Sequence, residues 1–230
     1  MEQEKIWDYF QNHDDLSRIV FPESRQLFFL RYLQAGTRVL NIGVGSGALE
    51  RLGLGKGVEM YSLDPSEKAI VRMQQILGMT DRARVGYAQN VPFDSDFFDV
   101  VVMSEVLEHL SDDILVCSLK EVFRVLRVGG VLLASTPYRE DLQASQVVCP
   151  SCGAVFHKVG HIQSFDKNRM RKLLQAAGFD VEKIWVTTFV DWQRKGFRNF
   201  IKSVIRVALA RMGEGIADPH LLVRARKPKR

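Results

Sequence analysis

The sequence has 230 residues, of which 46% are hydrophobic and 26% are charged, and its formal net charge is +5. These values match those of folded globular proteins and exclude a disordered, collagen-like or fibrous chain. Because the length suits one substantial hydrophobic core but hardly two, we expect a single domain over residues 1–230.

The start of the chain, residues 1–15, is polar and acidic and holds no apolar run of the kind that forms a secretory signal. The most apolar later segment is interrupted by Arg206 and Arg211, so no stretch reaches the length of a membrane span. We therefore expect a cytoplasmic protein.

Predicted strands and helices alternate along the chain. A first helix is predicted over residues 22–35, where apolar side chains follow a proline at helical spacing and a glycine ends the run. Strands are predicted at 38–42, 59–63, 85–88, 99–103, 131–135, 181–190 and 221–226. Further helices are predicted at about 47–53, 66–77, 111–126 and 167–177, the last ended by Gly178. The alternation indicates an α/β fold with a mostly parallel sheet covered by helices on both faces.

Two segments interrupt this alternation. Residues 137–165 contain prolines, glycines, a close pair of cysteines and two histidines, so we expect an inserted Cys/His loop without a regular strand or helix. Residues 195–212 have an apolar stripe with lysines and arginines beside it, which predicts an inserted basic amphipathic helix.

A glycine-rich turn follows the first predicted strand, where VLNIGVGSGALE holds Gly43, Gly45 and Gly47 before a helix. Glycines let the backbone turn tightly and approach a ligand closely. About 20 residues later Asp64 ends the next strand, where a carboxylate can accept hydrogen bonds from the hydroxyls of an adenosine ribose. The pair predicts a nucleoside-type cofactor, and a helix-capping role for Asp64 is compatible with it.

Five blocks follow one another over about residues 36–190: VLNIGVGSG, YSLDPS, GYAQNVPFDSDFFDVVVMSEVLEHL, LKEVFRVLRVGGVLLASTP and FDKNRMRKLLQAAGF. Together they resemble the class I S-adenosylmethionine-dependent methyltransferases, in particular the small-molecule enzymes related to the ubiquinone and menaquinone methyltransferases. A dinucleotide-dependent dehydrogenase could also carry the glycine turn, with Ala48 in the third glycine position. The EVLEHL and RVGGVLL patterns argue against hydride transfer.

The resemblance implies a Rossmann-like sheet of seven strands in the order 3-2-1-4-5-7-6, with the last strand antiparallel. It implies S-adenosylmethionine as cofactor, bound at the carboxyl ends of strands 1, 2 and 4. The cofactor-binding residues that it implies are Asn41, Gly43, Gly45 and Gly47 near the methionine part, Asp64 and Pro65 near the ribose, Gln89 and Asn90 near the adenine, and Ser104 on the methionine or acceptor side.

Two residues depart from the family pattern. Asn41 replaces the usual acidic residue before the glycine turn, and it can form hydrogen bonds but brings no charge to the cofactor's ammonium group. Tyr87 stands where aspartate is frequent, and its ring could stack on adenine. Asn41 is the feature that would favour a non-catalytic S-adenosylmethionine-binding protein.

Methyl transfer needs little chemistry from the protein, because the sulfonium donor is already activated and the enzyme mainly aligns the nucleophile. A base is needed only when the acceptor loses a proton. His161 is the preferred catalytic candidate, and Glu105 and His109 are the others, although His109 could simply pack at the start of a helix. The acceptor is expected to be a small molecule, and the sequence leaves open whether its oxygen, nitrogen or carbon is methylated.

The inserted loop suggests a metal site. In CPSCGAVFHKVGH, the residues Cys149, Cys152, His157 and His161 have spacing that suits tetrahedral zinc. The cysteines could instead bind metal together with a partner chain or stay free while the histidines serve the active site. If His161 is a metal ligand, it cannot also be the base.

Basic residues are concentrated near the end of the chain. They are Arg194, Lys195, Arg198, Lys202, Arg206, Arg211, Arg224, Arg226, Lys227, Lys229 and Arg230. A solvated or core-packing surface is the simplest interpretation; peripheral contact with an anionic membrane, and hence a lipid-linked acceptor, is the sharper hypothesis. RNA is a less favoured partner, because the sequence shows no RNA-recognition motif and no basic platform with interleaved aromatic residues of the kind that binds RNA. The oligomeric state is left open.

Overall fold

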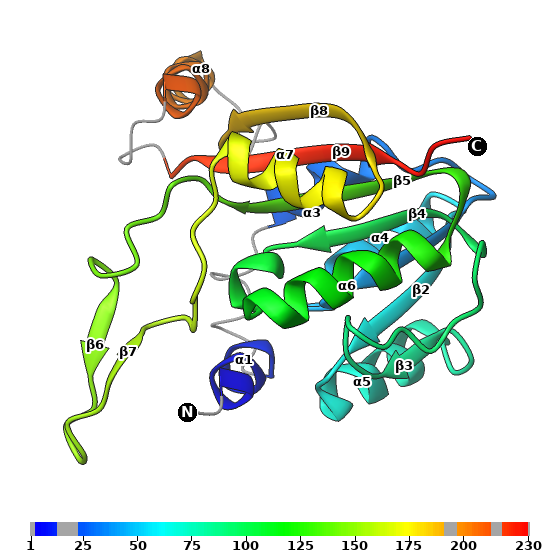
Figure 1. Ribbon diagram of the computed structural model, residues 1–230, viewed down its shortest axis with the longest axis horizontal. Helices are drawn as coiled ribbons and strands as arrows, with labels where there is room; N and C mark the ends of the chain where they lie inside the picture. Colours follow the sequence, from blue (N-terminus) through cyan, green and yellow to red (C-terminus); the bar gives the residue numbers. More distant parts are fainter. Residues whose placement is uncertain (1–2, 13–22, 191–196, 213–217, 230) are drawn as a thin grey trace.

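The computed structural model describes residues 3–12, 23–190, 197–212 and 218–229, and Figure 1 shows its layered arrangement. One seven-stranded sheet has the order β3-β2-β1-β4-β5-β9-β8. The strands are β1 Arg38–Ile42, β2 Glu59–Asp64, β3 Ala83–Val85, β4 Phe98–Ser104, β5 Leu126–Pro137, β8 Asp180–Thr187 and β9 His220–Arg226. In this sheet β9 runs antiparallel to both of its neighbours, β5 and β8, whereas the pairs from β3 to β5 are parallel. Since β8 and β9 are the sixth and seventh strands of this sheet, the predicted order 3-2-1-4-5-7-6 is confirmed.

Helices cover both faces of the sheet, as predicted. Their bounds are α3 Glu23–Leu30, α4 Ala48–Gly55, α5 Glu67–Leu77, α6 Asp112–Val125 and α7 Lys167–Ala176. Apolar side chains of α6 and α7 form one core with one face of the strands. Those of α3, α4 and α5 form a second core on the opposite face. Successive residues such as Val101 and Val102 alternate between the two cores, as the two-residue repeat of a strand requires.

Several boundaries differ from the predicted ones. β3 covers Ala83–Val85 and not the predicted 85–88, and a turn closed by the hydrogen bond from the Asn90 N–H to the Tyr87 carbonyl follows it. β5 starts at Leu126, directly after α6, so residues 127–130, which lie outside both the predicted helix and the predicted strand, belong to β5. Gly178 has a φ of +94° two residues beyond the end of α7, which confirms the left-handed stop.

The prediction that residues 137–165 lack regular structure was wrong. This segment forms a short antiparallel hairpin of β6 Gln146–Val148 and β7 Val155–His157, which extends away from the sheet in Figure 1. Its strands are three residues long, too short for a two-residue repeat to stand out in the sequence.

Two further helices are α1, near the start of the chain, and α8, between β8 and β9. Helix α1, Gln3–Gln11, was not predicted, and it covers the carboxyl ends of the strands (Figure 1). Helix α8, Phe197–Met212, agrees with the predicted amphipathic helix, of which residues 195 and 196 lie outside the described residues. None of the helices in the described part of the chain is long and apolar enough to cross a membrane.

Candidate functional site

A cavity of about 670 Å³ lies at the carboxyl ends of β1, β2 and β4. In open α/β sheets this edge is the usual place for a ligand, because the loops after neighbouring strands diverge there. The cavity is lined by the glycine turn, the end of β2, the loop after β3, the loop after β4, helix α1 and the 137–161 segment. It therefore joins the predicted cofactor residues to the predicted acceptor residues.

The glycine turn requires glycine at two of its positions. Gly43 has a φ of +87°, and a Cβ there would lie 2.7 Å from Val106 Cγ2. Gly47 has a φ of +77°, and a Cβ there would lie 2.4 Å from Met73 Cε. Both values of φ belong to the left-handed region that other residues rarely adopt. The turn can thus pass close to the next loop and helix and leave its backbone facing the cavity.

Asp64 ties the glycine turn to the end of β2. Its carboxylate accepts hydrogen bonds from the backbone N–H of Val44 at 2.8 Å and of Ser66 at 2.9 Å. Burial raises the pKa of Asp64, and these bonds partly oppose that rise. Because each carboxylate oxygen has two lone pairs, the group can accept further bonds from a ligand in the cavity. Pro65 also lines this end.

The amide at position 41, where the family usually has an acidic residue, is explained by its contact with the buried Glu50. Its Nδ2 donates to Glu50 Oε1 at 2.8 Å, and Glu50 is also bonded by Ser62 at 2.9 Å. Burial raises the pKa of Glu50 to about 7. A second carboxylate at position 41 would repel it, whereas an amide donates to it. Asn41 Oδ1 has no hydrogen-bond partner among the described residues and is a buried acceptor at the cavity wall.

The predicted adenine side is only partly at the cavity. Tyr87 and Gln89 line it. Asn90 is exposed and lies outside the lining, because its backbone N–H closes a turn onto the carbonyl of Tyr87. Gly86 and Ala88 contribute backbone and a small side chain to the same wall.

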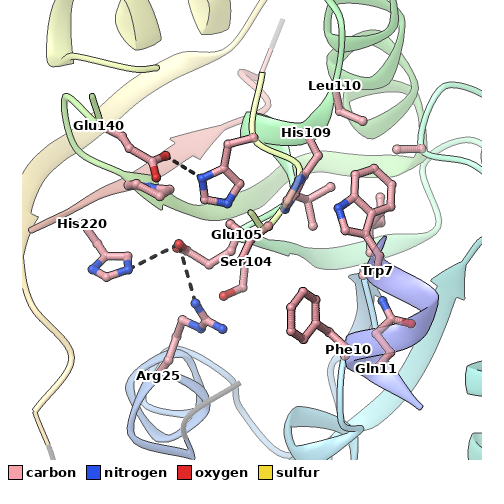
Figure 2. Close-up of a pocket in the computed structure, with 18 of the residues that line it drawn as sticks. Trp7, Phe10, Gln11, Arg25, Ser104, Glu105, His109, Leu110, Glu140 and His220 are labelled. Carbon is pink, nitrogen blue, oxygen red and sulfur yellow. Dashed lines mark hydrogen bonds and ion pairs between the residues drawn. The ribbon is translucent and has the colours of Figure 1, made fainter. Parts of the chain in front are cut away.

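Helix α1 closes the cavity from above the strand ends, as Figure 2 shows for Trp7, Phe10 and Gln11. Gln11 Nε2 donates to Asp64 Oδ2 at 3.4 Å at the cofactor end. The ring of Trp7 packs edge-on against His109 with 4.6 Å between centroids at the other end. One helix thus contacts both halves of the site.

Glu105 forms a buried charge cluster at the acceptor end (Figure 2). Its Oε2 lies 3.3 Å from His220 Nε2 and 3.6 Å from an Arg25 nitrogen, and Ser135 donates to Oε1 at 2.6 Å. Burial opposes ionisation of Glu105, but His220, Arg25 and Ser135 outweigh it and lower the pKa to about 2. Burial also opposes the charge on His220, and Glu105 outweighs it and raises the pKa of His220. Ser104 lies beside the cluster, with 3.2 Å between its Oγ and that of Ser135.

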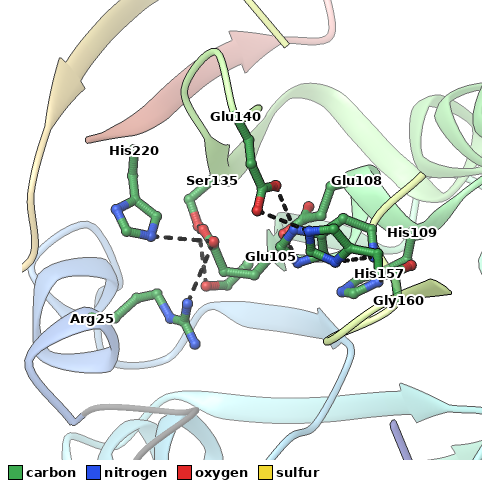
Figure 3. A network of polar contacts seen from close by, with 11 residues as sticks. Arg25, Glu105, Glu108, His109, Ser135, Glu140, His157, Gly160 and His220 are labelled. Atoms are coloured by element: carbon green, nitrogen blue, oxygen red, sulfur yellow. Dashed lines mark hydrogen bonds and ion pairs between the residues drawn. The ribbon is translucent and has the colours of Figure 1, made fainter. Parts of the chain in front are cut away.

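His109 and His161 lie together at the acceptor end, with 4.7 Å between ring centroids. Burial lowers the pKa of His109 to about 3, so its ring is neutral, and its Nδ1 lies 3.2 Å from the carbonyl oxygen of Gly160. His161 Nδ1 lies 2.5 Å from Glu140 Oε2. Burial raises the pKa of the neighbouring Glu108 well above its usual range. Figure 3 shows this cluster next to that of Glu105.

The structure does not bring the four predicted zinc ligands together. Cys149 and Cys152 lie in the turn between β6 and β7, whereas His157 and His161 pack against Glu140 at the base of the segment. Within the described residues, the groups of at least three potential ligands contain no cysteine. The three-residue strands of the hairpin separate the two pairs. Hydrogen bonds from the backbone N–H groups of residues 152 and 151 lower the pKa of the Cys149 thiol.

Sequence reasoning missed several residues of the site. Arg25, Glu108 and Glu140 belong to it, as do His220 and Trp7. They come from α3, the segments after β4 and β5, β9 and α1, and no local pattern connects them. The EVLEHL block contained a signal for Glu108, since it lies next to His109.

The comparison with known proteins agrees with this geometry. A family profile described as a methyltransferase domain matches residues 16–184. A relative named probable S-adenosylmethionine-dependent methyltransferase, from Mycolicibacterium smegmatis, is 32% identical over 64% of this chain and 54% of its own length. The demethylmenaquinone methyltransferase of Staphylococcus carnosus is 28% identical over 77% of this chain and 86% of its own. The chain spans about half the length of the first relative and 43% of an uncharacterized methyltransferase of Schizosaccharomyces pombe.

Solved structures share the fold. A putative methyltransferase from a complex with the Haloferax volcanii Trm112 activator superposes with a TM-score of 0.70 at 20% identity, over 97% of this chain and 98% of its own. A Burkholderia thailandensis N1-methyltransferase with bound S-adenosylhomocysteine superposes with a TM-score of 0.65 at 16% identity, over 99% and 87%. With its matched domain, its strand order and its cavity beside the glycine turn, the chain belongs to the class I S-adenosylmethionine-dependent methyltransferases.

Proposed function

We propose that the protein transfers the methyl group of S-adenosylmethionine to a small-molecule acceptor. The observation that carries this proposal is the continuous cavity, which has the glycine turn and Asp64 at one end and the His109 and His161 imidazoles at the other. Such a cavity can hold a nucleoside cofactor and a second, smaller molecule together. The curated relatives include enzymes named for menaquinone and ubiquinone synthesis, which supports a small acceptor.

The residues at the cofactor end fit S-adenosylmethionine. Asp64 can accept from the ribose hydroxyls, and the unpartnered Oδ1 of Asn41 can accept from the amino group of the methionine part. The turn at Gly43 has no room for a Cβ, and without a side chain the backbone of Gly43 can approach the ligand closely. When bound, the cofactor supplies an electrophilic methyl group on a sulfonium sulfur.

At the acceptor end, three features of the geometry indicate what the side chains do. Glu105 is ionised and already held by Arg25 and His220, so we propose that it orients the acceptor and the loop after β4 rather than removing a proton. His109 and His161 face the cavity, and we propose that they act on the acceptor's nucleophile. Trp7 and Phe10 cover this end and exclude water from it.

Calorimetric titration with S-adenosylmethionine tests the cofactor site. Asp64→Asn should weaken binding about tenfold to a hundredfold, because it replaces bonds to a charged acceptor, each worth roughly 1.5–3 kcal/mol, with weaker ones. Asp81→Asn is the matched control, since Asp81 is exposed on the loop before β3, and it should bind like the unaltered protein. Equal affinity of all three proteins, or no binding to any, would contradict the proposal.

For the acceptor, we further propose a lipid or lipid-linked molecule that is reached at an anionic membrane surface. Helix α8 exposes Ile201, Val204 and Ile205 next to Lys202 and Arg206. Exposed apolar side chains beside basic ones are the pattern of helices that lie in a membrane interface.

A further inference from the structure

We propose that Glu108, His109 and His161 bind a divalent transition-metal ion at the acceptor end of the cavity, and that the ion holds the acceptor's hydroxyl group. This inference rests on the proposed function and names the acceptor chemistry. One potential ligand atom from each of the three residues lies within 4.8 Å of the other two. Ligands of a tetrahedral zinc ion lie about 3.3–3.5 Å apart, so small side-chain movements suffice to close the site.

Glu108 provides independent support for a cation. Its side chain is fully buried, and neither of its carboxylate oxygens has a hydrogen-bond partner among the described residues. Its Oε1 lies 3.9 Å from His161 Nε2. A buried carboxyl group without partners is costly, and a bound cation removes that cost.

Both histidines are already oriented as metal ligands. The Nδ1 of His161 faces Glu140, and the Nδ1 of His109 faces the carbonyl of Gly160. In each case the oxygen that accepts this hydrogen bond keeps the imidazole proton on Nδ1. The lone pair of Nε2 is then free to bind a metal ion. A carboxylate or carbonyl on the second ring nitrogen is the usual arrangement around metal-binding histidines.

His157 and Glu140 position His161 and are not ligands. The ring of His157 stacks on that of His161 with 4.7 Å between centroids and 17° between planes. The Nδ1 of His157 accepts the backbone N–H of His161 at 3.1 Å, so the proton of His157 is on Nε2, which lies 3.3 Å from Glu140. A protonated nitrogen cannot bind a metal ion, which excludes the alternative group of Glu140, His157 and His161.

The three proposed ligands favour zinc-like ions and leave a coordination position open to the cavity. Two imidazoles and one carboxylate suit zinc and its neighbours in the first transition row, whereas magnesium and calcium prefer oxygen ligands. Three protein ligands leave at least one position open, and His109 and His161 both line the cavity. The open position therefore faces the acceptor.

The chemistry of this site favours an acceptor with a phenol-type or enol-type hydroxyl. A divalent ion lowers the pKa of a bound hydroxyl group, so its proton is released to water and no side chain has to act as base. The ionised oxygen forms a bond to the methyl carbon, the carbon–sulfur bond breaks, and its electron pair stays on the sulfur, which becomes a neutral thioether. His161 is in this case a ligand and not the base.

Zinc titration followed by elemental analysis tests the site. The protein, stripped with a chelator and then reloaded, should retain about one zinc ion per chain. Glu108→Gln and His161→Gln should lose it while keeping their affinity for S-adenosylmethionine, which shows that they are folded. The Cys149→Ser/Cys152→Ser double variant should retain the ion. Loss of the ion in the cysteine variant together with its retention in Glu108→Gln would overturn the proposal and place the metal in the hairpin turn.

Cobalt substitution gives a readout that does not depend on activity. The cobalt protein should show visible bands typical of nitrogen and oxygen ligands and no sulfur-to-metal charge-transfer band. A sulfur band, or absence of cobalt binding, would also overturn the site. Methyl transfer at full rate by metal-free protein would refute the metal proposal and leave the proposed function intact, whereas zinc binding without S-adenosylmethionine binding would refute the function and leave the site intact.

Discussion

At the scale of single residues, the glycine turn and the acid behind it determine the cofactor end. Asn41 donates to the fully buried Glu50, and Asp64 accepts from the backbone of Val44 in the turn. Each side chain therefore fixes the turn as well as facing the cavity. A substitution in this group is expected to change both the stability of the protein and its affinity for the cofactor.

Gly43→Ala should destabilise the protein by about 2–4 kcal/mol, because it adds a strained positive φ to a clash with Val106. Gly36→Ala is the control, since Gly36 has a φ of +77° but nothing lies within 4 Å of its Cβ position. It should lose only about 1 kcal/mol from the strain. Urea denaturation measures both values, and equal losses would show that the close approach to Val106 has no energetic weight.

Elements that are remote in sequence complete the site. Helix α1 joins Gln11 at the cofactor end to Trp7 at the acceptor end, and the 137–165 segment brings in Glu140 and His161. Neither role could be predicted from amphipathic pattern, because α1 is short and the hairpin strands have three residues each. Packing against the strand ends gives these elements their positions.

The membrane role of α8 is testable as a property of this element. The protein should co-sediment with vesicles that contain phosphatidylserine and much less with pure phosphatidylcholine, and binding should fall as salt increases. Ile201→Ser/Ile205→Ser should weaken this binding, because both side chains are exposed on α8. Ile76→Ser is the control, since Ile76 is exposed on α5. Equal binding to both kinds of vesicle, or an equal effect of both variants, would contradict the role.

At the scale of the whole molecule, the Glu105 cluster links parts of the chain that are far apart in sequence. Arg25 comes from α3, Glu105 follows β4, and His220 begins β9. The cluster is 11% exposed at the Glu105 and His220 side chains, so its charges are poorly screened by water. It should contribute to the free energy of global unfolding, and its contribution should depend on pH.

The two pKa shifts determine how this contribution to the free energy of unfolding changes with pH. The pKa of Glu105 falls from 4.5 to about 2, so its contribution is present above 4.5 and is lost as pH falls toward 2. The pKa of His220 is raised above 6.5, so its contribution is present below 6.5 and is lost as pH rises through the raised value. His220→Gln should therefore cost the most, on the order of 1–3 kcal/mol, between pH 4.5 and 6.5 and less at alkaline pH.

Chemical denaturation at several pH values measures this difference. Arg224→Gln is the control, because Arg224 pairs with Glu182 at 2.5 Å but the two side chains are 33% and 31% exposed. An exposed pair of this kind contributes less than about 1 kcal/mol. A cost of His220→Gln that does not change with pH would show that the histidine is not charged in the cluster.

The sequence by itself determined the sheet, most of its helices and most of the residues that line the proposed cofactor end of the cavity. These depend on local patterns: β-branched runs for the strands, glycines where φ is positive, and an aspartate at the end of β2. Only the tertiary structure decided the acceptor end. It separated Cys149 and Cys152 from His157 and His161, and it brought His161 of a remote segment close to Glu108 and His109. Spacing along a chain predicts neighbours within one element, whereas a site shared by several elements depends on how they pack.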